Sequence, residues 1–445
     1  MRIIIHRGTE EIGGSCVEIE TGNTRILLDF GMPLKDPSGA DFTERDIEGM
    51  PLEKLIEMKY LFDIKGLYKT SIPSIDGIFI SHSHKDHYGF LSHVNPEIHV
   101  YLSKGVYGLI HALNIFLPAS KRTCIYKPIF LRNWEKISMG ELSVTPYLVD
   151  HSGFNAMGFL ITEESTGKTI LYSGDFRVGG WTKKRYEAFL KKPLKDVDCL
   201  LMEGTMVGRE NGKYPDEESV VRGIMEAVKK CRNKVIPVYC SGQNIDRIVS
   251  LYKAARKTGS LLVVDPYTAC MLKVAGEITG STPEIEWDSI RVFVANYGKG
   301  DIYVNKIARS SRKEMLISIG RKKIKTFNFA EQTKKALLLM RNTMIPVVER
   351  IPEIKGSILI YSQWKGYVEK DTPDARRFRE FVRRHDLTIE HIHTSGHATI
   401  EQLKKFAEKV NARHIVPIHT EHPDEFKKHF GDKVVHYKDG QVLSL

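Results

Sequence analysis

His82-Ser83-His84-Lys85-Asp86-His87 is the segment that decides the fold of this 445-residue chain, and the short apolar run Gly77–Ile80 comes shortly before it. The apolar run is typical of a buried strand, which places the polar segment at the end of that strand. Imidazole nitrogen and carboxylate oxygen are good ligands for zinc and its divalent relatives. Chance supplies only about 0.003 such patterns in a chain of this composition. The segment therefore predicts a metal-binding loop, with a histidine-rich surface loop as the alternative.

One loop is not a complete metal site. His82 and His84 alternate along an extended backbone and face the same side, whereas the Asp-His pair comes after the chain has turned and can face a second ion. Two later segments offer more ligands, because Asp150–Gly153 follows an apolar run and Leu171–Asp175 reads as a strand ending in Gly-Asp. A lone His or Asp at a strand end is more often hydrogen-bonded or solvated than metal-bound. The order of the three segments is the stronger signal.

This order resembles the metallo-β-lactamase superfamily, whose first signature is matched by Ile26-Leu-Leu-Asp29-Phe-Gly31. The resemblance implies that Asp29 supports the metal loop through hydrogen bonds without being a ligand. Thioesterases, lactamases, oxygen-reducing flavoproteins and nucleases all share the superfamily fold. The resemblance therefore indicates fold and metal more securely than substrate.

Composition narrows the class of protein. The length suits two or three domains of about 150 residues, and the 42% hydrophobic content favours a well-buried core. No apolar run reaches the roughly 18 residues that a membrane helix needs, and the six cysteines are scattered without a CxxC pair. These features predict a cytoplasmic protein with no membrane partner. The net charge of +11 suggests a polyanionic partner.

The texture of the sequence changes after Gly204. Short strands dominate before it, apart from an amphipathic helix expected over Glu53–Lys65. Helices and strands then alternate, which indicates a parallel βαβ unit inserted into the first domain. The expected elements are helices over Pro215–Lys230 and Asn244–Lys257, with strands over Lys234–Tyr239 and Leu261–Asp265. From Ser357 the short-strand texture returns, with strands over Ser357–Tyr361, Ile389–His393 and His414–Ile418 and helices over Asp374–Arg384 and Ile400–Val410.

The stretch from Asn296 to Lys325 is strongly basic, with nine Lys and Arg against two acidic residues. Tyr297, Tyr303 and Phe327 are interleaved with the charges. Charge runs are usually solvated surface, and nucleic-acid contact is the alternative. Within this stretch, Arg321, Lys322 and Lys323 are the expected contacts to substrate.

Three later segments narrow the resemblance. They are Leu200-Leu-Met-Glu203-Gly-Thr205, His391-Ile-His-Thr-Ser395-Gly396-His397-Ala and Ile415-Val-Pro-Ile-His419-Thr-Glu421. They resemble motifs A, B and C of the β-CASP branch, the nucleic-acid-processing members of the superfamily, which include the ribonuclease J family. Gly8–Cys16 and Val238–Arg247 are similar to the opening of these enzymes and to the start of their inserted domain. The branch implies an α/β protein: an αββα metallo-β-lactamase sandwich (1–205 and 356–445) with an inserted parallel α/β β-CASP domain (206–355).

The resemblance also implies a two-metal site. Carried over to this sequence, it assigns one metal to His82, His84 and His151, the second to Asp86, His87 and His419, and a bridging position to Asp175. His397 becomes the catalytic histidine, oriented by Glu203, and Asp86 and Asp175 join them in catalysis. Ser395 and Gly396 are expected to contact substrate. Two Zn²⁺ per chain are expected, with Mn²⁺ or Fe²⁺ as alternatives.

The function implied is hydrolysis of phosphodiester bonds in single-stranded RNA. Water activated by the two metals attacks phosphorus, and His397 protonates the leaving oxygen, so that the products carry a 3′ hydroxyl and a 5′ phosphate. Histidine at the motif C position, His419, is typical of RNA-processing members of the branch. Endonuclease activity is favoured over 5′ exonuclease activity.

Three alternatives stay open from the sequence. A DNA nuclease of the same branch would share every motif. A small-molecule metallohydrolase such as a thioesterase or lactamase would need neither the basic stretch nor the later histidines. A non-catalytic binding subunit would have lost ligands, whereas every expected ligand is present here. Two departures from close relatives also stand out: a longer segment between Asp29 and the metal loop, and no recognisable appended RNA-binding module.

Overall fold

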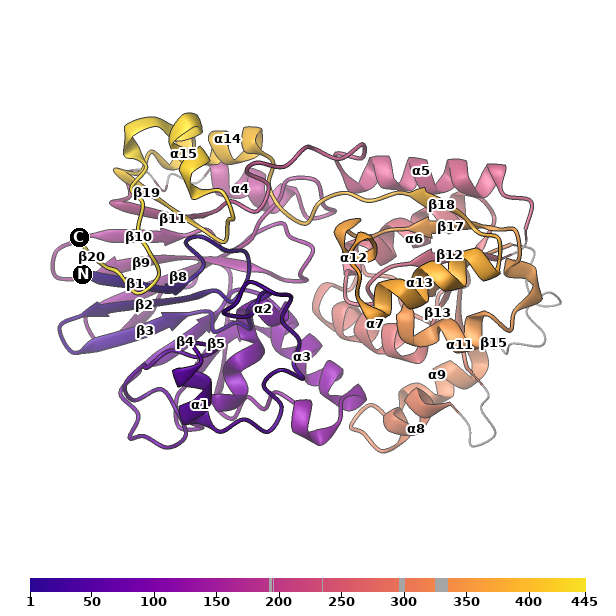
Figure 1. Cartoon of the computed structure of the whole chain (residues 1–445), viewed down its shortest axis with the longest axis horizontal. Helices are drawn as coiled ribbons and strands as arrows, with labels where there is room; N and C mark the ends of the chain where they lie inside the picture. Colours follow the sequence, from indigo (N-terminus) through magenta and orange to yellow (C-terminus); the bar gives the residue numbers. More distant parts are fainter. Residues whose placement is uncertain (192–193, 195, 234, 296–300, 325–334) are drawn as a thin grey trace.

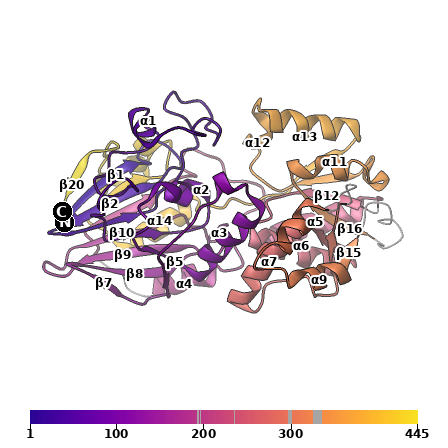
Figure 2. The same ribbon diagram turned by 90° about the horizontal axis from the view of Figure 1, so that it is seen from below.

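Three sheets build two lobes that lie side by side (Figure 1). The structure, a computed structural model, describes residues 1–191, 194, 196–233, 235–295, 301–324 and 335–445. Two sheets form the lobe that holds both chain termini, and the third sheet forms the other lobe (Figures 1 and 2).

The first lobe is a sandwich of two mixed sheets, with strand orders β20-β1-β2-β3-β4-β5-β6 and β19-β11-β10-β9-β8-β7. Ile26 and Phe79 of the first sheet are fully buried in one cluster with Phe159 and Ile170 of the second, because alternate side chains of each strand face the opposing sheet. The strands are β1 Arg2–Arg7, β2 Cys16–Thr21, β3 Thr24–Leu28, β4 Gly77–Ile80, β5 Val100–Ser103, β6 Pro128–Leu131, β7 Ile137–Met139, β8 Leu142–Leu148, β9 Met157–Glu163, β10 Thr169–Tyr172, β11 Cys199–Glu203, β19 His414–Ile418 and β20 Val442–Ser444.

Helices cover both outer faces of this sandwich. Leu55 and Val106 lie in the cluster that seals the first sheet, and Phe189 and Phe406 lie in the cluster that seals the second. The layers are therefore helix, sheet, sheet, helix. The helices on the first sheet are α1 Leu52–Glu57, α2 Lys85–Tyr88 and α3 Lys104–Phe116, and those on the second are α4 Lys184–Lys191, α14 Ile400–Val410 and α15 Pro423–Phe430.

The third sheet is all parallel, in the order β15-β14-β13-β16-β12-β17-β18. Helices cover both faces, with Ile224 and Leu251 in one buried cluster and Val348 and Phe378 in the other. The strands are β12 Val235–Tyr239, β13 Leu261–Val264, β14 Ile290–Phe293, β15 Lys323–Ile324, β16 Ala336–Met340, β17 Ile358–Tyr361 and β18 Thr388–His391. The helices are α5 Glu217–Lys230, α6 Ile245–Lys257, α7 Pro266–Thr279, α8 Ile302–Ala308, α9 Met315–Lys322, α11 Ile345–Val348, α12 Gly366–Glu369 and α13 Pro373–Arg384. The predicted α/β fold class is confirmed.

The third sheet extends further along the chain than the sequence predicts. β17 pairs in parallel with β12, and β18 pairs in parallel with β17, although both strands follow residue 355, where the return to the sandwich was expected. The run β17, α13, β18 is itself a strand–helix–strand unit, so it continues the parallel winding. We therefore propose that the inserted unit extends from α5 to β18, and that the chain re-enters the sandwich at the turn before α14.

The helix expected over Glu53–Lys65 is shorter in the structure. α1 ends because Lys59 has a φ of 60°, and the amides of the next two residues both donate to the Leu55 carbonyl. Leu61 and Ile64, whose spacing suggests a longer helix, are buried from a loop instead.

The sequence predicts cysteines without disulfide bonds and no membrane-spanning helix. All six cysteines are free, five of them buried and Cys124 exposed. Within the described ranges, no helix is both long and apolar enough to cross a bilayer.

Candidate metal centre

The carboxyl ends of several strands meet at the side of the sandwich that faces the other lobe (Figure 1). In the second sheet β10, β11 and β19 are parallel, and β8 runs the same way because two antiparallel pairings separate it from β10. In the first sheet β3 and β4 are parallel. The candidate residues at or just after these strand ends are Asp29, His82, His151, Asp175, Glu203 and His419.

His82, His84 and His151 form the first group of possible ligands. His84 Nδ1 lies 2.9 Å from His82 Nε2 and 3.3 Å from His151 Nε2. With Zn–N distances of about 2.0–2.1 Å, a tetrahedral ion separates its nitrogen ligands by about 3.3–3.4 Å. Burial lowers the pKa of His82 and His151 well below its usual value and that of His84 to about 4, so the group is held in the neutral form that binds metals.

Backbone contact fixes the tautomer of His151. Its Nδ1 donates to the Gly396 carbonyl at 2.6 Å, so Nε2 keeps the lone pair that faces the other two imidazoles. This bond also ties the loop after β8 to the turn that carries His397.

Asp86, His87 and His419 form the second group. Asp86 Oδ2 lies 3.3 Å from His419 Nε2 and 3.8 Å from His87 Nε2. His87 Nδ1 donates to Asp29 at 2.7 Å, and within the described structure the buried Nε2 atom makes no aligned hydrogen bond. Burial opposes protonation, but the charges of Asp175 and Asp29 outweigh it and raise the pKa of His87 well above its usual value. The same negative field favours a divalent cation.

Asp175 lies between the two groups. Its Oδ2 atom is 3.2 Å from His87 Nε2 and 3.8 Å from both His82 Nε2 and His419 Nε2. Burial opposes ionisation, but His419 and His87 outweigh it and hold the pKa of Asp175 well below its usual value. One charged oxygen thus faces histidines of both groups, which is compatible with the bridging role predicted for Asp175.

Imidazoles and carboxylates at this spacing fit divalent metals. The donors are nitrogen and oxygen, which suit zinc and also manganese or iron. In each group the possible ligand atoms lie within 4.8 Å of one another, and Asp175 appears in two of the groups that contain these histidines. The division of the seven side chains between two ions stays a prediction.

Asp29 supports the metal loop through hydrogen bonds. Its carboxylate accepts hydrogen bonds from the Ser81 amide and hydroxyl and from Tyr172 as well as from His87, each at 2.7 Å. Four donors leave this carboxylate little capacity for a metal. Tyr172 carries no sequence signal for this role, because it reads as an ordinary core residue of β10.

His397 stands next to both groups, against a buried carboxylate. Its Nδ1 atom is 3.4 Å from Glu203 Oε2 and 3.9 Å from Asp175 Oδ2. Burial opposes protonation, but Glu203 outweighs it and raises the pKa of His397. Glu203 also accepts from the amides of Thr205 and Ala398 at 3.0 and 3.3 Å, so it holds two of the loops that form the centre.

Two family models match the chain. Residues 62–237 match the β-lactamase superfamily domain, and residues 385–436 match the Zn-dependent metallo-hydrolase RNA specificity domain. The chain belongs to the metallo-β-lactamase superfamily. The first match spans the candidate ligands from His82 to Asp175, and the second spans His397 and His419.

Two curated relatives and one solved structure are also similar to this chain. The chain is 23% identical to "Transcription termination factor FttA" of Methanothermobacter thermautotrophicus (93% of this chain, 65% of the relative). It is also 23% identical to "Ribonuclease J" of Helicobacter pylori (93% of this chain, 55% of the relative). The chain thus spans between half and two thirds of the length of these curated relatives. A crystal structure of a protein of unknown function from Enterococcus faecalis shares the fold, with a TM-score of 0.78, 23% identity and 100% and 99% of the two chains covered.

A buried ionic network joins the candidate metal centre to the other lobe. The sequence does not predict this network. Arg177 Nη2 lies 2.6 Å from Asp246 of α6, and its Nη1 donates to the Ser395 carbonyl at 3.1 Å. Glu217 of α5 lies 3.4 Å from Arg177 and 3.0 Å from Arg247. Arg177 comes two residues after Asp175, and that nearness to a candidate ligand is the only sequence signal for it.

The predicted substrate contacts fall in two separate places. Ser395 and Gly396 lie in the turn beside His151 and His397. Arg321 and Lys322 end α9 and Lys323 begins β15, at the opposite edge of the third sheet from β18. Six strand spacings of about 4.8 Å put these two edges about 29 Å apart. Tyr297, Lys299, Lys325 and Phe327 lie outside the described residues.

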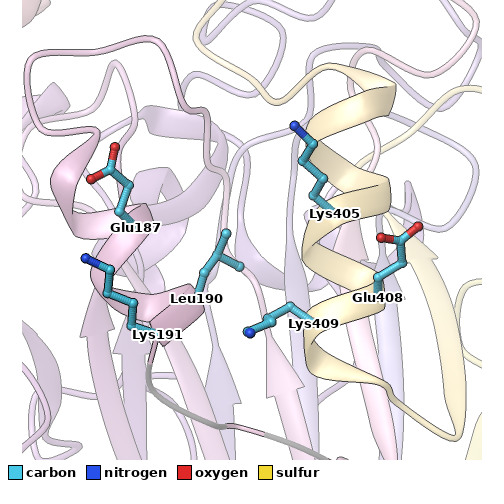
Figure 3. A pocket seen from close by; sticks show the side chains of 6 residues that line it. All are labelled: Glu187, Leu190, Lys191, Lys405, Glu408 and Lys409. Carbon is cyan, nitrogen blue, oxygen red and sulfur yellow. The ribbon is translucent and has the colours of Figure 1, made fainter.

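A surface hollow of about 520 Å³ lies between α4 and α14, on the outer face of the sandwich (Figure 3). Its lining is charged except for one leucine: Glu187, Leu190, Lys191, Lys405, Glu408 and Lys409. None of the candidate ligands is among these residues. The hollow is therefore separate from the metal centre.

Proposed function

We propose that this chain is a metal-dependent ribonuclease that hydrolyses phosphodiester bonds in single-stranded RNA. One observation carries the proposal. His397 lies in the region that matches the RNA specificity domain, next to Glu203, and its Nδ1 atom is 3.9 Å from the carboxylate of Asp175. A small-molecule hydrolase of the superfamily would not need a further histidine such as His397 beside the two metal-binding groups.

The residues divide the chemical work between them. Two divalent ions, when bound, supply activation of a water molecule and charge for a phosphate oxygen. His82, His84 and His151 would hold one ion, Asp86, His87 and His419 the other, with Asp175 shared. His397 would donate its proton to the leaving 3′ oxygen, and the Glu203 carboxylate would keep the imidazole charged and aimed. The products would carry a 3′ hydroxyl and a 5′ phosphate.

The choice of RNA rests on three supports. The RNA specificity model matches, one relative is named a ribonuclease, and the net charge of +11 suits a polyanion. We favour internal cleavage over stepwise removal from the 5′ end. Six free cysteines suit a reducing compartment such as the cytoplasm.

The test is a cleavage assay on protein purified without chelators. Matched RNA and DNA oligomers, single- and double-stranded and internally labelled, are compared with a generic ester, in zinc and in manganese. Faster cleavage of single-stranded RNA, together with two metals per chain by elemental analysis, would support the proposal. Equal or faster DNA cleavage in both metals would overturn the RNA assignment, and hydrolysis of the ester alone would overturn the nuclease assignment.

A further inference from the structure

Two large aromatic side chains, Trp364 and Tyr367, are exposed on the lobe that is built on the third sheet. Trp364 is 45% exposed and Tyr367 is 59% exposed, and their ring centres are 5.4 Å apart. They lie in the segment between β17 and α13, around the short helix α12. Both views place α12 at the side of the third-sheet lobe that is turned toward the sandwich (Figures 1 and 2).

The segment that carries these rings is held in place. The Tyr361 hydroxyl donates to the Trp364 carbonyl at 3.1 Å, and His391 Nε2 lies 2.8 Å from the Gln363 carbonyl. A Cβ atom at Gly366 would lie 2.3–2.5 Å from carbons of the Trp364 ring, so the indole packs directly on the glycine backbone. The exposed aromatic surface is therefore positioned in advance, and little side-chain entropy is left to lose on binding.

A short chain of contacts connects the rings to the metal centre. The Arg209 guanidinium lies 5.4 Å from the centre of the Trp364 ring, and Arg209 Nη2 lies 2.9 Å from Glu421 Oε2. Glu421 is two residues beyond His419. Although 59% of the Tyr367 side chain is exposed, partial burial of the phenol and the Asp86 carboxylate of the metal loop together raise the pKa of Tyr367.

We propose that Tyr367 and Trp364 form an aromatic platform that stacks an unpaired nucleobase of the substrate strand beside the metal centre. The proposal rests on the proposed function and adds a subsite for a base. Every base has a π face, so the platform would accept any sequence. A base in a duplex is already stacked on its neighbours, so the platform would favour single strands.

The experiment compares a short single-stranded RNA with the matched ribose-phosphate strand that lacks bases. Equilibrium binding and KM are measured for the wild type, Tyr367→Leu, Trp364→Leu and Tyr367→Phe. Stacking on one ring contributes roughly a fivefold or greater gain in affinity. Each leucine variant should therefore weaken binding of the normal strand at least fivefold, change binding of the base-free strand less than twofold, and keep its metal content. Tyr367→Phe should bind the normal strand like the wild type.

The control is Tyr126→Leu, which removes a 63% exposed ring just before β6, at the amino end of that strand and away from the metal centre. Equal losses on both strands, or no loss, would overturn the platform. Binding is measured separately from cleavage, so the two proposals fail separately. A protein that binds bases through these rings but cleaves neither RNA nor DNA would overturn the proposed function alone.

Discussion

At the scale of single residues, the chemistry of this centre depends on what each imidazole does with its second nitrogen. His87 Nδ1 donates to Asp29 and His151 Nδ1 donates to the Gly396 carbonyl, so in each residue Nε2 is the nitrogen left to face its group. His397 differs, because its nearest charged neighbour is Glu203 and its Nδ1 makes no aligned hydrogen bond within the described residues. Geometry alone admits His397 as a ligand or as a proton donor, since it also lies in a group of possible ligands.

His397→Ala separates these two roles. We expect a loss of cleavage of at least about a hundredfold with metal content unchanged, because a general acid typically contributes that much. Glu203→Gln should give a smaller loss of the same kind. Rates on an RNA oligomer and elemental analysis of the same samples check this.

The matched control is His436→Ala, which removes an exposed histidine from the C-terminal region and should leave both quantities unchanged. If His397→Ala instead loses one metal per chain, with activity falling in proportion, His397 is a ligand.

At the scale of elements, the metal loop depends on close backbone packing beneath it. Gly31 lies against the start of α2, where an added Cβ would stand 1.7 Å from the Asp86 carbonyl oxygen. Two backbone hydrogen bonds hold the same place: the Ser15 amide donates to the Asp86 carbonyl at 3.0 Å, and the Met32 amide donates to the Lys85 carbonyl at 2.9 Å. The loop after β3 and the loop after β4 are therefore pressed together with no room for a side chain.

Gly31→Ala should consequently destabilise the protein by about 1–3 kcal/mol or more, because the clash is with backbone that must move. The displaced loop should also bind metal less tightly. Urea denaturation and metal titration measure the two effects.

Gly320→Ala provides the contrast. An added Cβ there meets nothing within 4 Å, and the residue lies in α9, where alanine is favoured over glycine by roughly 0.5–1 kcal/mol. This variant should be neutral or more stable. Similar losses in both variants would show that crowding at Gly31 is not the cause.

At the scale of the whole molecule, the lobes share a buried ionic network around Glu217. Its side chain is 1% exposed and faces both Arg177 and Arg247. Burial opposes ionisation, but the two arginines outweigh it and lower the pKa of Glu217 to about 2. A carboxyl with a lowered folded pKa stabilises the fold above its ordinary pKa of 4.5 and loses that contribution as the pH falls toward 2.

Glu217→Gln should therefore cost about 3–5 kcal/mol near neutral pH, because two buried guanidinium groups lose a charged partner. The difference from wild type should shrink as the pH falls below about 4.5. Asp246 contributes to the same difference, because burial raises its pKa to about 6 and the Glu217 charge adds to that rise.

Denaturation of both proteins across the acid range measures this difference. Glu218→Gln is the matched control. Glu218 is the next residue along the chain, and its carboxylate is 53% exposed and should contribute little at any pH. A difference that stays constant with pH would contradict the assignment of the stabilisation to the Glu217 charge.

The basic stretch also belongs to this scale, because β15, which lies in its described part and begins with Lys323, is at the opposite edge of the third sheet from the strand that leads to His397. Changing Arg321, Lys322 and Lys323 to glutamine should flatten the slope of log affinity against log salt by up to about 2, at about 0.7 per single-strand phosphate contact. The effect should appear with long RNA and vanish with RNA too short to span the sheet.

Binding measured over a range of salt concentrations checks this prediction. Lys427, Lys428 and Lys433, changed together, are the control, since they are exposed on the sandwich lobe. An unchanged slope with long RNA would make the stretch an ordinary solvated surface.

The metal loop and most element positions could be predicted from the sequence. β4, α14 and β19 have the predicted bounds, because an apolar period and a capping residue are encoded within a few neighbouring positions. The loop after β4 was recognisable for the same reason: its ligands are adjacent in the chain. His397 and His419 needed the family motifs, because nine of the 17 histidines lie between His385 and His436 and composition does not single out two of them.

Only the tertiary structure decided which distant groups meet. The Gly396 carbonyl that orients His151 is 245 residues away along the chain, and the Asp246 carboxylate that holds Arg177 is 69 residues away. Local periodicity carries no information about such partners. It also placed β17 and β18 in the return segment of the sandwich, because a short apolar strand reads the same in either sheet. Strand pairing across the whole chain sets these contacts, and that pairing is a property of the fold.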